Sequence, residues 1–186
     1  MAVLDEILAF NEQFVANKEY EKYTTTKFPE KKLVIISCMD TRLTELLPQA
    51  MNVKNGDVKI IKTAGAIISH PFGSVMRSIL VAIYALKATE VCVIGHYDCG
   101  MAGLDSEAFI QTMKETGDIS DDTLNTLKYS GMDLNNWLKG FNRVEDAVVD
   151  SVNMVKQHPL LPKHVPVHGL AIDPATGKLD CIVNGY

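Results

Sequence analysis

Three short, largely apolar runs constrain the fold of this chain more than any other feature. They are Leu33–Ile36, Val58–Ile61 and Val91–Ile94. Continuous runs of this length are typical of strands that are buried on both faces, as in parallel sheets covered by helices. Between the second and third runs, residues 73–87 repeat apolar side chains at helical spacing. This strand, helix, strand order predicts a parallel sheet.

The remaining segments predict the elements around that sheet. Val3–Val15 carries apolar residues on one side of a helix, and Arg143–Gln157 does the same. Residues 105–140 are polar and acidic with short helical patches, and we expect surface helices there that cover one side. Val165–Ile172 and Lys178–Val183 flank a turn-rich segment and predict a hairpin at the sheet's edge. The predicted fold is α/β, with a central, mostly parallel β-sheet flanked by helices and a C-terminal edge hairpin.

Size and charge narrow the classes of function. A chain of 186 residues can bury one sizeable core, so we expect a single domain over residues 1–186. The net charge of −5 provides no basic field for nucleic acid or an anionic membrane, which favours a small-molecule substrate. The first ten residues lack the pattern of a signal peptide, and no apolar stretch is long enough to span a bilayer. We therefore expect a cytoplasmic protein.

Two clusters of metal-binding residue types follow predicted strands. Cys38, Asp40 and Arg42 come directly after the first strand, and His96 and Cys99 come after the third. Ligands in open α/β sheets bind outside the carboxyl ends of the strands, so both clusters should face one crevice. Two thiolates and one imidazole suit zinc, and three protein ligands leave a fourth position open, as in catalytic zinc sites.

The other two cysteines do not complete a closed site. Cys92 lies in the middle of the third apolar run and Cys181 lies in the terminal hairpin, where cysteine usually behaves as a small hydrophobic residue. A reducing cytosol also argues against disulfides. Asp40 is the nearest candidate for the open position.

With these motifs the chain resembles the β-carbonic anhydrases, whose metal motifs are Cys-x-Asp-x-Arg and His-x-x-Cys. The resemblance implies one zinc ion per chain, bound by Cys38, His96 and Cys99, with Asp40 either a fourth ligand or held by Arg42. It implies reversible hydration of carbon dioxide to bicarbonate by attack of zinc-bound hydroxide. It also implies a homodimer or a higher homo-oligomer.

Three other functions stay open at this point. Relatives with the same motifs hydrolyse carbonyl sulfide or carbon disulfide, which are linear molecules like carbon dioxide. A zinc-stabilised binding module without catalysis would need a closed site with four ligands. A thiol phosphatase is disfavoured because only three residues separate Cys38 from Arg42 and none is glycine. One departure from the family pattern is Lys62-Thr63, where the family often has Arg-Asn.

Overall fold

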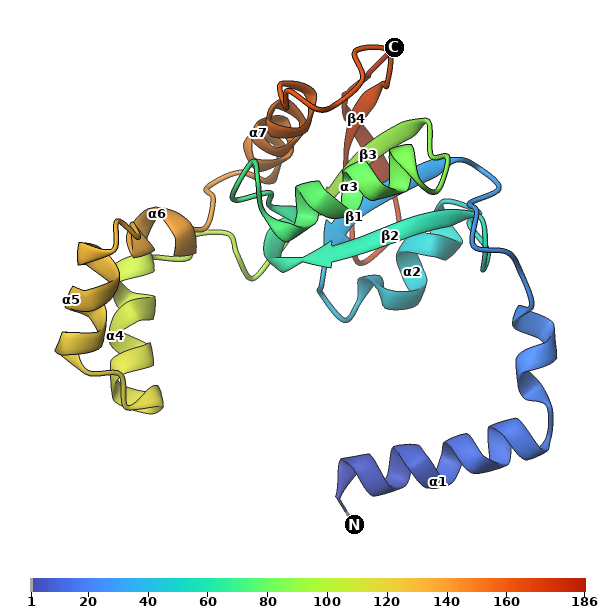
Figure 1. The fold of residues 1–186 in the computed structure, drawn as a ribbon, viewed down its shortest axis with the longest axis horizontal. Helices are drawn as coiled ribbons and strands as arrows, with labels where there is room; N and C mark the ends of the chain where they lie inside the picture. The colour runs from blue at the N-terminus through green and yellow to red at the C-terminus, as the bar shows by residue number, and fades with distance from the viewer. Residues whose placement is uncertain (1) are drawn as a thin grey trace.

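A five-stranded sheet forms the centre of the protein, whose computed structural model describes residues 2–186 (Figure 1). Its strand order is β2-β1-β3-β4-β5. The strands are β1 (Leu33–Cys38), β2 (Val58–Thr63), β3 (Glu90–His96), β4 (Val167–Ile172) and β5 (Leu179–Val183). The first four are parallel to one another, whereas β5 pairs antiparallel with β4. The predicted α/β fold with its C-terminal edge hairpin is therefore confirmed.

The central strands carry the buried runs. β1 and β3 are neighbours, and almost every residue in them is buried. β2 has the same kind of sequence but lies at the edge of the sheet, and its Ile60 side chain is 41% exposed. β1 and β3 also extend two residues beyond the apolar runs, so Cys38 and His96 are the last residues of their strands.

Helices cover both faces of the sheet. α3 (Ser74–Tyr84) and α7 (Val144–Lys156) pack on one face, together with the β1 side chains Val34 and Ile36. α2 (Leu43–Ala50) packs on the other face against Ile35. The helices predicted over residues 73–87 and 143–157 are confirmed. α2 was not predicted, because it is short and contains a proline.

Residues 105–140 form helices, but the expectation that these helices cover one side of the sheet is wrong. α4 (Ser106–Gly117), α5 (Asp121–Tyr129) and α6 (Leu134–Leu138) stand away from the sheet and contact one another (Figure 1). No residue of these three helices is buried, as their polar sequences allow. Apolar side chains of all three helices, among them Ile110, Leu124 and Leu134, line a hollow between these helices and do not pack on the sheet.

The N-terminal helix also projects from the sheet. α1 (Val3–Ala16) is confirmed where the sequence predicted a helix, and a short 3-10 turn at Glu19–Tyr23 follows it. Figure 1 shows α1 set apart from the sheet, and none of its residues is buried in the part of the chain that is described. No helix within residues 2–186 has both the length and the apolar character required to cross a membrane.

Candidate metal centre

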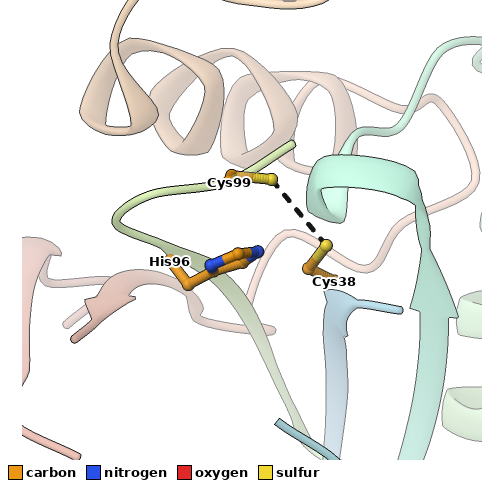
Figure 2. A group of neighbouring side chains, drawn as sticks. All are labelled: Cys38, His96 and Cys99. Atoms are coloured by element: carbon orange, nitrogen blue, oxygen red, sulfur yellow. Dashed lines mark hydrogen bonds between the residues drawn. The ribbon is translucent and has the colours of Figure 1, made fainter. Parts of the chain in front are cut away.

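The topology of the sheet brings the two predicted clusters together. β1 and β3 are adjacent and parallel, so Cys38 and His96 lie side by side at the carboxyl ends of their strands. Cys99 follows in the loop after β3 and turns back toward Cys38 (Figure 2). The two sulfur atoms are 3.9 Å apart, and one ligand atom from each residue lies within 4.8 Å of the others. This spacing allows all three side chains to bind one ion.

The surroundings of His96 prepare its ring for a metal. The side chains of Cys38, His96 and Cys99 are all buried. The Nδ1 atom of His96 is 2.8 Å from the carbonyl oxygen of Tyr97, so Nδ1 carries the proton and donates a hydrogen bond to that oxygen. Nε2 is buried and has no hydrogen-bond partner among residues 2–186. A buried nitrogen lone pair beside two thiols is a set of donor atoms that fits a zinc ion.

The two thiols differ in acidity. Burial raises the pKa of Cys38, but the nearby imidazole of His96 and the backbone at Asp40 and Gly65 outweigh burial and lower this pKa to about 7. Burial raises the pKa of Cys99 to about 11, and the adjacent Cys38 charge adds to the increase. Two thiols at this distance therefore ionise one at a time unless a cation compensates both charges.

A carboxylate and a guanidinium lie directly beside this group. The Oδ1 atom of Asp40 accepts from the backbone amide and the Nε of Arg42 at 2.9 and 3.0 Å, and Oδ2 accepts from Nη2 at 2.9 Å. Hydrogen bonds from Arg42 lower the pKa of Asp40 to about 2. Oδ2 is also 3.8 Å from Nε2 of His96. Asp40 is therefore ionised and held by Arg42 at the margin of the three-residue group.

One contact of Arg42 was not predicted. Its guanidinium also donates to the side chain and the carbonyl oxygen of Asp98, both at 2.8 Å. Asp98 lies within the His-x-x-Cys motif, where its proximity to His96 and Cys99 hid it among the spacer residues. Only the three-dimensional structure brings it to Arg42.

Comparison with known proteins decides the family. A sequence profile of the carbonic anhydrase family matches residues 33–179. The crystal structure of β-carbonic anhydrase isoform I from Trichomonas vaginalis is 35% identical, and the alignment covers 100% of both chains with a TM-score of 0.90. The chain belongs to the β-carbonic anhydrase family. The members of this family are enzymes. Its solved members include two tetrameric β-carbonic anhydrases from Sordaria macrospora.

Relatives of this chain carry two kinds of name. A Bacillus subtilis protein named "Putative carbonic anhydrase YvdA" is 63% identical over 186 residues, which cover 100% of this chain and 94% of that protein. A carbon disulfide hydrolase from Acidithiobacillus thiooxidans is 28% identical, with 80% of this chain and 76% of that protein covered. The same scaffold therefore occurs in proteins named for two different substrates.

The structure also describes the two positions where this chain departs from the family pattern. Lys62 points its Nζ toward the carbonyl oxygen of Cys38 at 3.3 Å. Thr63 pairs with Cys38 in the sheet register, and its hydroxyl is buried without a hydrogen-bond partner among the described residues. Both residues thus lie next to the end of β1.

Proposed function

We propose that this chain catalyses the reversible hydration of carbon dioxide to bicarbonate with one zinc ion per chain. The observation that carries the proposal is the buried group of Cys38, His96 and Cys99, whose ligand atoms lie within 4.8 Å of one another. When bound, zinc acts as a Lewis acid that makes a water molecule nucleophilic near neutral pH.

The residues of the site have distinct tasks in this proposal. Cys38 and Cys99 supply two thiolates that together balance the charge of a divalent ion. His96 presents Nε2, because its other nitrogen donates to the Tyr97 carbonyl oxygen. These three ligands leave one position of a tetrahedral zinc site for water or substrate. Among the described residues, neither Cys92 nor Cys181 belongs to the group of ligand atoms.

Asp40 and Arg42 act on the attacking water. Arg42 holds both oxygens of Asp40, and the carboxylate stays ionised near Nε2 of His96. In this position Asp40 accepts a hydrogen bond from the water and orients its lone pair toward the carbon of carbon dioxide. Asp40 as a fourth ligand is the alternative arrangement, and it requires the carboxylate to leave Arg42.

The substrate is tested by comparing three linear molecules. We expect the zinc-loaded protein to hydrate carbon dioxide, measured by stopped-flow acidification of a buffered indicator, at a higher kcat/KM than it hydrolyses carbonyl sulfide or carbon disulfide. A higher kcat/KM for carbon disulfide would place the chain with the hydrolases instead. Inactivity toward all three molecules at full zinc occupancy would favour a non-catalytic zinc site.

We also propose that two copies associate through α1. Large apolar side chains of this helix are half to three-quarters exposed: Val3, Leu4, Ile7, Leu8, Phe10 and Val15. An apolar groove of about 350 Å³ runs along α3 and includes the exposed side chains Phe72, Val81 and Tyr84. A second copy of the chain can cover both apolar surfaces. The α1 helix of each subunit would lie in the α3 groove of the other subunit and bury both.

A pair of charge substitutions tests this association. Leu8→Glu places a carboxylate on the apolar side of α1, whereas Gln13→Glu places one on the opposite side of the same helix. We expect sedimentation equilibrium to give a dimer or larger for the wild type and for Gln13→Glu, and a weakened assembly for Leu8→Glu. A monomeric wild type at micromolar concentration would refute the association.

A further inference from the structure

Arg42 lies between two carboxylates, and only one of them belongs to the Cys-x-Asp-x-Arg motif. On one side, Nε and Nη2 donate to Asp40 at 3.0 and 2.9 Å. On the other side, Nη1 donates to Oδ2 of Asp98 and Nη2 donates to its carbonyl oxygen, both at 2.8 Å. Four hydrogen bonds therefore fix the plane of the guanidinium from both sides.

The backbone of Asp98 is held in an uncommon conformation. Its φ is 53°, in the left-handed region that costs energy for most residues and that aspartate and asparagine tolerate better than others. The side chain is 86% exposed, so burial does not stabilise this conformation. Non-glycine residues in such regions concentrate at functional sites, and here the strained residue contacts a residue of the site.

We propose that Asp98 is a positioning residue that holds Arg42 and, through Arg42, sets the orientation of the Asp40 carboxylate. The inference rests on the proposed function of Asp40. The side chain of Arg42 is long and 42% exposed, so the guanidinium can turn into solvent once the Asp98 carboxylate no longer accepts a hydrogen bond from it. Asp40 would then keep its bond from the backbone amide of Arg42 and lose both bonds from the guanidinium.

Two substitutions separate this role from a purely structural one. Asp98→Gly removes the carboxylate and also relieves the left-handed backbone, so it should not lower the melting temperature. Asp98→Asn tolerates the same backbone and keeps one oxygen for Nη1. The matched control is Asp118→Gly, because Asp118 also has a φ of 53° but lies at the end of α4, away from the site.

We expect Asp98→Gly to lower kcat about fivefold, the effect of losing one solvent-exposed ionic hydrogen bond. KM and zinc content should stay at their wild-type values, and Asp98→Asn should lower kcat less. Asp118→Gly should leave kcat unchanged. Neither glycine variant should melt below the wild type.

A second readout does not depend on activity. The chain has three arginines, Arg42, Arg77 and Arg143, so their Nε–H signals can be resolved and assigned by NMR. The Nε–H of Arg42 should exchange with solvent faster in Asp98→Gly than in the wild type or in Asp118→Gly. Unchanged exchange in Asp98→Gly would overturn the inference even if the wild type proved inactive, and so would a wild-type kcat in that variant if the enzyme is active.

Discussion

A methyl group added at Gly95 tests how the packing of α7 supports the metal centre. Gly95 directly precedes His96 on β3, and a Cβ there would lie 2.6 Å from Cγ2 of Val144 and 2.9 Å from Cγ2 of Val148. Both valines belong to α7 and are buried. Val148 cannot turn aside, because its other methyl group already faces Gly169, where a Cβ would lie 2.6 Å from Cγ1. Helix and strand must therefore separate in Gly95→Ala.

The cost of this substitution follows from packing. An extra methyl group in a closely packed core costs about 2 kcal/mol. The alanine restricts the unfolded chain and returns about 0.7 kcal/mol. The remaining loss of about 1.3 kcal/mol lowers the melting temperature by about 4 °C in a chain of this size. Because His96 moves with β3, zinc should also transfer to a chelator more readily.

Gly100→Ala is the matched control for this measurement. Gly100 directly follows Cys99, and a Cβ at that position would have no neighbour within 4 Å among the described residues. Differential scanning calorimetry at equal protein and zinc concentrations should show Gly100→Ala within about 1 °C of the wild type. If Gly95→Ala melts at or above the wild type, the packing argument is wrong.

Three further predictions concern the site and the cysteines. Cys38→Ser, His96→Ala and Cys99→Ser should each lose bound zinc and turnover together, as elemental analysis and stopped-flow assays would show, and retention of either property would contradict the ligand assignment. Arg42→Ala frees Asp40 and should lower kcat by at least about tenfold while zinc content falls much less; equal losses would mean that Arg42 supports the metal rather than the reaction. In the zinc-loaded native protein, iodoacetamide should label Cys181, which is exposed, and spare Cys92, because burial raises the pKa of that thiol to about 12; mass spectrometry that finds carbamidomethyl Cys92 before unfolding would refute this.

The sequence predicted the sheet and the meeting of Cys38, His96 and Cys99 because both depend on local patterns. An uninterrupted apolar run such as Leu33–Ile36 requires burial on two faces, and the carboxyl ends of a parallel pair of such strands must lie side by side. Cys38 and His96 were therefore expected together from their positions alone. Three ligands of the right chemistry, each at the end of its strand or just beyond it, then indicated a metal.

Other features depend on contacts that no local pattern records. Residues 105–140 read as surface helices, but sequence polarity does not tell whether such helices lie on the sheet or stand away from it. The edge position of β2 depends on strand order rather than on its own residues. Asp98 looks like a spacer until the loop turns it toward Arg42, 56 residues away in the chain.

The most direct test of the account is a zinc titration of the metal-stripped protein, with carbon dioxide hydration measured at each step. If Cys38, His96 and Cys99 form one catalytic site per chain, activity should rise in proportion to added zinc and reach its maximum at about one zinc per chain. Full activity in the stripped protein, or no activity at one bound zinc per chain, would contradict the assignment.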